Sequence, residues 1–180
     1  MALLFETPRL QAVSADSSLA KDGLRFEVEN REAFAPFGVE RESAYYTLSS
    51  FRSIYRLYDE LFRSKRGLTA LYYEKNELIA VVSLSQILYA HSQSAKLGYS
   101  VDHRHWHMGY GKEAVTGMIT YAFERLGLHR LEANILPTNN ASIKLIEALG
   151  FTSEGIVRHY AQRNGVWEDH LRYSLINESS

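Results

Sequence analysis

The order of apolar and polar positions predicts alternating strands and helices along the chain. Apolar residues recur at three- and four-residue steps over four segments, which is the spacing of a helix with one buried stripe. These predicted helices cover 17–30, 43–62, 112–126 and 140–149. Shorter apolar runs bounded by turn residues predict seven strands, at 6–13, 68–73, 78–89, 96–101, 129–136, 151–162 and 166–176.

Glycine and proline mark several of the boundaries between these elements. Gly127 and Gly150 each follow a predicted helix, where a left-handed residue commonly ends it. Asn164-Gly165 separates the last two strands and predicts a hairpin turn. The residue before a proline is biased away from helix, so Pro36 predicts a loop over 30–37.

Length and composition indicate one folded domain over residues 1–180, with 46% hydrophobic and 23% charged residues. The net charge of −1 gives no reason to expect a nucleic acid or an anionic membrane as partner. The chain has no cysteine, which excludes disulfides, cysteine-bound zinc and a thiol nucleophile. No apolar run approaches transmembrane length, and the run at 2–5 is too short for a signal peptide. We therefore expect a cytoplasmic protein, either a monomer or a homodimer.

The stretch from 96 to 127 carries the clearest sign of a binding site. It reads as a strand, a turn that contains Gly109 and Gly111, and a helix from about Lys112. The first N–H groups of a helix are unpaired and carry partial positive charge, so such a turn suits a phosphate or pyrophosphate. The spacing is neither that of a P-loop nor that of a dinucleotide fold, because Ala114 stands at the third glycine position.

This turn resembles the acetyl-coenzyme A (acetyl-CoA) loop of the GNAT superfamily of N-acetyltransferases, whose motif is Gln/Arg-x-x-Gly-x-Gly/Ala. The matching residues are Trp106-His107-Met108-Gly109-Tyr110-Gly111, with Trp106 in place of Gln or Arg and Met108 in place of a frequent Lys or Arg. Pro137-Thr138-Asn139-Asn140-Ala141-Ser142 and Glu147-Ala148-Leu149-Gly150-Phe151 are similar to the second coenzyme segment of the family. The hairpin at 155–170 and the loop at 30–37 resemble the branch that acetylates ribosomal proteins on an N-terminal alanine or serine.

The resemblance implies a three-layer α/β fold, with a mixed sheet of about seven strands that splays in the middle and helices on both faces. It also implies acetyl-CoA as co-substrate, bound where the strands at 96–101 and 129–136 part. Backbone amides of the glycine turn would hold the pyrophosphate, and the strand would pair with the pantetheine arm. The implied coenzyme residues are Tyr99, Ser100, Val101, His107, Met108, Gly109, Tyr110, Gly111, Lys112, Asn139 and Ser142.

Direct attack of a neutral amine on the thioester would need a base but no covalent enzyme intermediate. Glu132 is the first candidate base, with Glu168 and Asp169 as alternatives, although Glu132 could equally be an exposed strand carboxylate. Ser142 could protonate the leaving thiolate or serve only in the helix. Asn139 could cap that helix, bind the pantetheine, or do both.

On the acceptor side, the resemblance implies contacts from Asn30, Phe34, Phe37, Tyr160 and Asp169, while packing is the other interpretation of Tyr160. His103, His105 and His107 would share one face of an extended strand and could suggest zinc, but the glycine turn argues against a straight strand. We expect no metal and place His107 near the pyrophosphate. The acceptor is either a protein N-terminus or a small amine, and a coenzyme-binding sensor without catalysis is the third hypothesis.

Overall fold

A continuous eight-stranded sheet forms the centre of the computed structural model, which describes residues 2–39 and 41–178. The strands are β1 (Leu3–Glu6), β2 (Gln11–Ser14), β3 (Leu68–Glu74), β4 (Glu77–Leu88), β5 (Ser94–Val101), β6 (Arg130–Ile135), β7 (Thr152–Arg163) and β8 (Val166–Ile176). The helices are α1 (Ala20–Glu29), α2 (Arg31–Phe34), α3 (Leu48–Arg63), α4 (Tyr110–Glu124) and α5 (Asn140–Ala148). Three short 3-10 turns are η1 (Ser17–Leu19), η2 (Ser43–Tyr45) and η3 (His103–His105).

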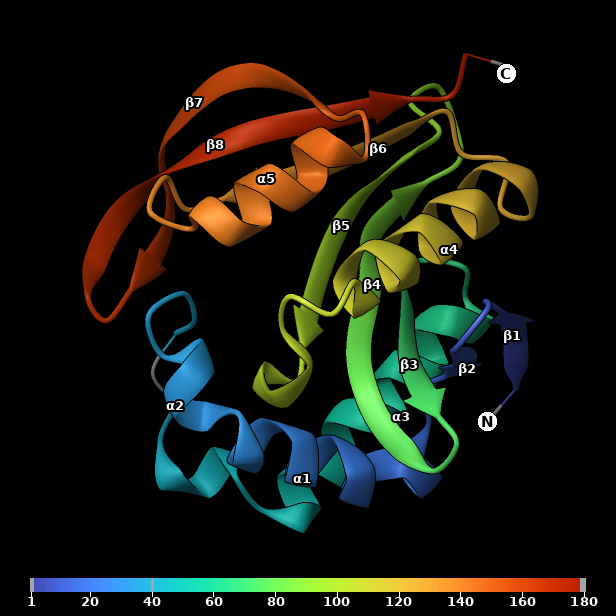
Figure 1. Ribbon diagram of the computed structural model, residues 1–180, viewed down its shortest axis with the longest axis vertical. Coiled ribbons are helices and arrows are strands. Elements are labelled where there is room, and N and C mark those ends of the chain that lie inside the picture. Colours follow the sequence, from blue (N-terminus) through green and yellow to red (C-terminus); the bar gives the residue numbers. More distant parts are fainter. Residues whose placement is uncertain (1, 40, 179–180) are drawn as a thin grey trace.

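The strands lie in the order β1-β2-β3-β4-β5-β6-β8-β7, and every neighbouring pair is antiparallel except β5 and β6. Helices α4 and α5 pack against one face of the sheet, while α1 and α3 pack against the other (Figure 1). This arrangement confirms the predicted α/β fold with a mixed sheet and helices on both faces. Among the described residues, no helix has both the length and the apolar character needed to span a membrane.

The parallel pair in the middle of the sheet is short. Only Ser94, Ala95 and Lys96 of β5 have partners in β6, and those partners are Arg130, Leu131 and Glu132. Beyond Lys96 the two strands separate, as Figure 1 shows between β5 and β6. The sheet is therefore splayed at its centre, and the starts of α4 and α5 follow the separated ends of these two strands.

The first predicted strand, at 6–13, is wrong because the structure has two short strands joined by a turn. The Thr7 N–H donates to the Leu10 carbonyl (2.8 Å), and the Thr7 hydroxyl accepts from the Leu10 N–H (3.0 Å). Pro8 lies inside this turn and does not lead into a strand. The side-chain hydrogen bonds of Thr7 stabilise the turn.

The predicted loop at 30–37 is also wrong in part, since Arg31–Phe34 form α2 and Ala35 keeps helical angles before Pro36 (φ −51°, ψ −39°). Phe34 packs on Phe26 of α1 with ring centroids 5.7 Å apart, so tertiary packing outweighs the local bias of the proline. The glycine predictions are confirmed, because Gly127 and Gly150 have φ of +65° and +86°.

Gly117 lies where β1 crosses α4, and it allows the close approach of these two elements. A Cβ at this position would lie 2.6 Å from Phe5 Cε2 and 3.0 Å from Thr7 Cγ2. Phe5 is itself held between the rings of Tyr72 and Tyr121, with centroid distances of 5.9 and 5.4 Å. The helix therefore has no free room for a methyl group here.

We expect Gly117→Ala to lower the free energy of unfolding by about 1 kcal/mol. Helix propensity favours alanine by about 1 kcal/mol, while overpacking costs about 1–3 kcal/mol. Chemical denaturation of Gly117→Ala beside Thr116→Ala, an exposed neighbour in the same helix, measures the difference. A Gly117→Ala protein with a higher free energy of unfolding would show that β1 moves away at no cost and that the close contact does not limit stability.

Candidate functional site

The turn between β5 and α4 contains two residues in the left-handed region. His107 has φ +62° and Gly109, the N-cap of α4, has φ +83°. The Glu113 N–H makes the first helical hydrogen bond, to the Gly109 carbonyl (3.1 Å). The three preceding N–H groups, of Tyr110, Gly111 and Lys112, lie in the first turn and are available to an anion.

These angles place the turn at 107–109, whereas the prediction put both Gly109 and Gly111 in it. Gly111 is a helical residue, and a Cβ there would meet Leu145 Cδ1 at 2.9 Å and Val101 Cγ2 at 3.3 Å. Its lack of a side chain therefore serves packing between α4, α5 and β5.

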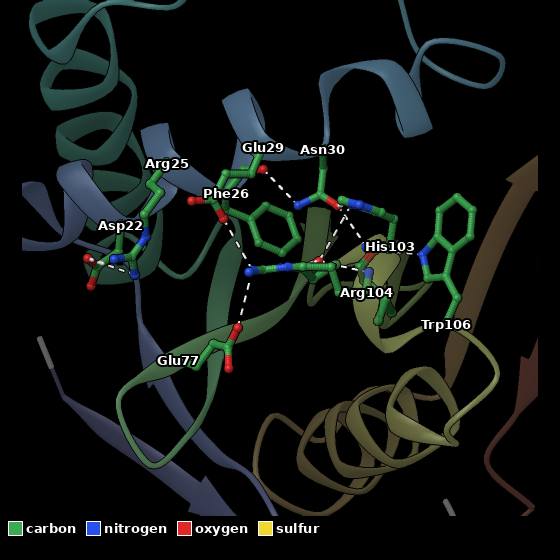
Figure 2. A network of polar contacts seen from close by, with 11 residues as sticks. Asp22, Arg25, Phe26, Glu29, Asn30, Glu77, His103, Arg104 and Trp106 are labelled. Atoms are coloured by element: carbon green, nitrogen blue, oxygen red, sulfur yellow. Dashed lines mark hydrogen bonds and ion pairs between the residues drawn. The ribbon is translucent and has the colours of Figure 1, made fainter.

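Arg104 anchors η3, which leads into this turn. Its guanidinium donates to Asp102 Oδ1 through Nε (3.0 Å) and contacts Glu29 Oε2 and Glu77 Oε1 through Nη2, both at 3.2 Å (Figure 2). Burial by itself raises the pKa of Asp102, but the hydrogen bonds and charge of Arg104 outweigh burial and lower that pKa below its ordinary value. The network joins η3 to α1 and to the β3–β4 turn.

Asn30, one of the predicted acceptor contacts, belongs to the same region and is fully buried. Its Oδ1 accepts from the His103 N–H (2.7 Å) and lies 2.8 Å from His103 Nδ1, while its Nδ2 donates to the Phe26 carbonyl (2.9 Å). Figure 2 shows this side chain between α1 and η3. In this structure Asn30 connects two elements and does not face solvent.

Residues 103–105 form a 3-10 helix, so the three histidines do not line one face of an extended strand, as the glycine turn led us to expect. His103 contacts Asn30, whereas the His105 ring lies edge-on to Tyr110 with centroids 5.4 Å apart. Side-chain atoms of Glu77, Asp102 and His105 lie within 4.8 Å of one another, but the Arg104 guanidinium already contacts both carboxylates.

Arg9, in the β1–β2 turn, contacts the turn at 107–109 and the start of α4 from the side opposite Arg104. It was not identified from the sequence. Its Nε donates to Glu113 Oε2 (2.6 Å), its Nη1 donates to the Met108 carbonyl (3.1 Å), and its Cζ lies 3.9 Å from the centre of the Tyr110 ring. Burial raises the pKa of Glu113, but hydrogen bonds from Thr7 and Arg9 outweigh it and lower that pKa. The turn is thus fixed from two directions.

The open edge of β5 offers backbone groups on the side where β6 has moved away. The Asp102 N–H donates to the Ile79 carbonyl (2.9 Å), and hydrogen-bonded pairs alternate along an antiparallel ladder. In this alternation the backbone N–H and C=O of Ser100 pair with β4, whereas those of Tyr99 and Val101 point toward the opening. The indole Nε1–H of Trp106 already donates to the Val101 carbonyl (2.8 Å).

Three of the predicted coenzyme residues meet across the opening, although they come from β5 and from the start of α5. The Tyr99 hydroxyl lies 2.5 Å from Ser142 Oγ and donates to the Ser142 carbonyl (3.2 Å). Asn139 caps α5 by accepting from the Ser142 N–H at Oδ1 (3.1 Å), which leaves its Nδ2 group available to another acceptor. Burial raises the pKa of Tyr99 to about 12, although the hydrogen bond with Ser142 lowers it, so Tyr99 is a neutral phenol at pH 7.

Glu132, the first candidate base, lies at the closed end of the splay, opposite Lys96 in the last parallel pair. Its Oε1 accepts from Arg130 Nε (2.9 Å), and the same guanidinium donates to both oxygens of Glu154 (2.8 and 2.6 Å). The Ser174 hydroxyl also donates to Glu154 (2.7 Å). Glu132 is therefore one member of a charged cluster.

The remaining predicted acceptor residues lie around the β7–β8 hairpin and the segment after α2. The Tyr160 hydroxyl accepts from Lys96 Nζ (3.3 Å), and the Tyr160 ring packs on His170. His159 has a left-handed backbone, and its N–H donates to Asp169 Oδ1 (2.8 Å). Glu168 pairs with Arg163 (2.6 Å), and Arg163 Nη1 donates to the Pro36 carbonyl (2.8 Å).

This last contact joins the hairpin to the segment that follows α2, near the predicted contact residues Phe34 and Phe37. Phe34 is packed against α1, while Phe37 remains 40% exposed. Figure 1 shows the segment and the hairpin side by side below the β6–β8 part of the sheet. Of the predicted aromatic contacts in this segment, Phe37 is the one that can still reach an incoming molecule.

Comparison with known proteins identifies relatives over most of the chain. The family model of the acetyltransferase (GNAT) domain matches residues 19–152. A probable N-acetyltransferase of Bacillus subtilis, YjcK, is 37% identical over 160 residues, which cover 88% of each chain. The ribosomal-protein-S5-alanine acetyltransferase of Vibrio fischeri has a TM-score of 0.91 at 31% identity, with 97% of each chain covered. The microcin C7 self-immunity acetyltransferase MccE, solved with acetyl-CoA and AMP, shares the fold at a TM-score of 0.85 and 20% identity, over 94% of this chain and 93% of its own.

The Arg130–Glu154 pair predicts an acid-dependent loss of stability. Hydrogen bonds from Arg130 and Ser174 lower the pKa of Glu154 to about 2, from an ordinary value of 4.5. A carboxyl with a lowered pKa stabilises the fold above its unfolded pKa, and this stabilisation disappears as the pH falls from 4.5 toward 2. Because Glu154 is about one-third exposed, solvent screening leaves about 1 kcal/mol.

We expect Glu154→Gln to lower the free energy of unfolding by about 1 kcal/mol at pH 7 and by progressively less below pH 4.5. Urea unfolding over a pH series measures this convergence with the unmodified protein. Glu124→Gln, at an exposed position of α4, is the matched control. Its free energy of unfolding should differ from that of the unmodified protein by the same amount at every pH. A constant difference at every pH would contradict the ionic origin of the stabilisation.

Proposed function

This chain belongs to the GNAT acetyltransferase family, and on that premise we propose that it transfers the acetyl group of acetyl-CoA to the N-terminal α-amine of a protein. Family membership makes the chain an acetyl-CoA-dependent N-acetyltransferase. The observation that supports the acceptor is the similarity, over 97% of each chain, to an enzyme named for the alanine of a ribosomal protein. We propose the same class of acceptor here, in a single catalytic domain.

The residues around the opening between β5 and β6 fit acetyl-CoA. Their polar groups suit its pyrophosphate and its pantetheine arm, and they follow one another along β5 in the same order as these parts of the coenzyme. We assign the pyrophosphate to the turn at His107–Gly109 and to the first N–H groups of α4, which include that of Lys112. The pantetheine arm would run back along β5, pairing with the open backbone groups of Tyr99 and Val101. The Nδ2 group of Asn139 would donate to the same arm. Bound acetyl-CoA supplies an activated thioester.

The chemistry that follows is direct attack by the amine. The nitrogen forms a bond to the acetyl carbon, the carbon–sulfur bond breaks, and the thiolate leaves with the electron pair. The nitrogen, positively charged after the attack, gives up a proton to yield the amide, and the thiolate takes up a proton to yield the free thiol. A backbone N–H of the open β5 edge would polarise the carbonyl oxygen. The start of α5, with Ser142 and its Tyr99 contact, would stabilise or protonate the thiolate.

The amine must first lose its ammonium proton, and we propose that Glu132 accepts it directly or through water. An α-amine, with a pKa near ~8, gives up this proton more readily than a lysine near ~10.4. An N-terminus is therefore an acceptor that needs little help from the base. Glu168 and Asp169 remain the alternatives. Each of the three carboxylates already accepts one hydrogen bond, Glu132 from Arg130, Glu168 from Arg163 and Asp169 from the His159 N–H.

Trp106 offers a direct test of the coenzyme site, because its indole uses a Val101 carbonyl that we assign to the pantetheine. Trp106→Phe should free this carbonyl and tighten acetyl-CoA binding about 3- to 10-fold, which matches about 0.5–1.5 kcal/mol for one hydrogen bond. Titration calorimetry measures the affinity, with Trp167→Phe on the β7–β8 hairpin as the matched control. Weaker binding by Trp106→Phe would show instead that the indole itself contacts the coenzyme.

An acceptor survey tests the proposed substrate. Release of free thiol from acetyl-CoA is followed with peptides that begin with Ala or Ser and, at equal concentration, with polyamines, aminoglycosides and amino-acid derivatives. We expect kcat/KM for the peptides to exceed that for the small amines by about 10-fold or more. Turnover of small amines alone would overturn the proposal and assign the same coenzyme site to a small-molecule acetyltransferase.

A further inference from the structure

Lys96 occupies the closed end of the splay, on the face of the sheet away from α4 and α5. It forms the last parallel pair, with Glu132, before β5 and β6 separate. Its neighbours Ala95 and Leu97 are buried in the core beneath α4, so the alternation of the strand directs Lys96 to the opposite face. On that face its ammonium group reaches Tyr160 of β7.

The partners of the Lys96 ammonium group are neutral. Nζ donates to the Tyr160 hydroxyl at 3.3 Å and lies 5.4 Å from the centre of the Tyr160 ring, and that ring packs on His170. Within the described part of the chain, the ion pairs near Lys96 join Arg130 to Glu132 and to Glu154, a further pair joins Arg163 to Glu168, and none joins Lys96. The Lys96 charge is held in place without being neutralised.

Charge on this face is unevenly matched. Arg172 also faces this side, because it lies opposite Asn134 in the β6–β8 ladder, and its Nε donates to the Asn134 amide oxygen (3.3 Å). Among the described residues around Lys96, three cations (Lys96, Arg130 and Arg172) face two carboxylates (Glu132 and Glu154), while Arg163 and Glu168, further along the hairpin, pair with each other. Such a surface attracts an anion and repels a polycation.

We propose that Lys96 is a specificity determinant that binds a carboxylate of the acceptor, close to the amine that is acetylated. The inference rests on the proposed function, which puts the pyrophosphate at the far end of β5 and the thioester near the closed end of the splay. An acceptor amine that approaches Glu132 then passes Lys96. The acceptor class is an amine with a nearby carboxylate, such as an N-terminus followed by an acidic residue.

The long, flexible stem of lysine suits this role. Nζ can leave the Tyr160 hydroxyl for a carboxylate without moving β5, and a charge-assisted hydrogen bond is stronger than the neutral one it replaces. Tyr160 is in this scheme a positioning residue, which holds the ammonium group at the acceptor entrance between turnovers. Its hydroxyl, not only its ring, is needed for that function.

The test compares three peptides that differ only at the second residue and begin Ala-Glu, Ala-Gln and Ala-Lys. For the unmodified enzyme we expect kcat/KM to be about 10-fold higher with Glu than with Gln, and lowest with Lys. Lys96→Met should abolish the preference for Glu, and Lys96→Glu should invert it in favour of Lys. Lys21→Met, at an exposed position of α1, is the control that should keep the preference of the unmodified enzyme.

An unmodified enzyme with equal activity on all three peptides would overturn the proposal, and so would a preference that survives in Lys96→Met. Acetyl-CoA affinity and the thermal midpoint of each variant show that the comparison is made on folded, coenzyme-binding protein. A second panel, of amino acids and their carboxamides, separates the proposed role of Lys96 from the proposal that the acceptor is a protein N-terminus. Preference for the free carboxylate that disappears in Lys96→Met would support the role of Lys96 even if no peptide were a substrate.

Discussion

The early end of pairing between β5 and β6 is the constraint on which the rest of the molecule depends. Two strands that stop pairing in the middle of a sheet leave backbone N–H and C=O groups that need partners. Here the Trp106 indole donates to the Val101 carbonyl on the open edge of β5, and the Tyr99 side chain bridges the opening to Ser142. Both helices that begin at the separated ends turn their unpaired N–H groups toward the same region. One interruption thus creates a strand edge and two helix starts around one opening.

The surroundings of this opening are rigid where the coenzyme is expected to bind. Arg104 and Asn30 tie η3 to α1, and Arg9 ties the following turn to α4. The left-handed angle of His107 costs a non-glycine residue of order 1 kcal/mol, and these contacts hold the backbone in that conformation. The acceptor side is bounded differently, by a segment and a hairpin that meet through Arg163 and the Pro36 carbonyl.

Much of this architecture could be predicted from local pattern, because it is encoded by periodicity and by turn residues. The alternation of helices and strands after residue 43, the left-handed glycines and the Asn164-Gly165 hairpin need no distant information. Gly111 was predicted to belong to the turn because it resembles a turn glycine, whereas its constraint is Leu145, 34 residues further along the chain. Arg9, Arg104 and Lys96 have no local signature. Apart from Asp102, two residues before Arg104, the partners named for these side chains lie on other elements, so only the folded chain shows those contacts.

The positions of the two tryptophans have a consequence for how the protein can be observed. Trp106 lies against the open end of β5, on the coenzyme side, and Trp167 is 56% exposed on the hairpin that borders the acceptor side. Each half of the proposed site, for the coenzyme and for the acceptor, therefore has one tryptophan beside it. With one indole replaced at a time, the emission of the other becomes a separate optical record of coenzyme arrival or of acceptor arrival. The order in which the two substrates bind can then be followed in real time without an attached label.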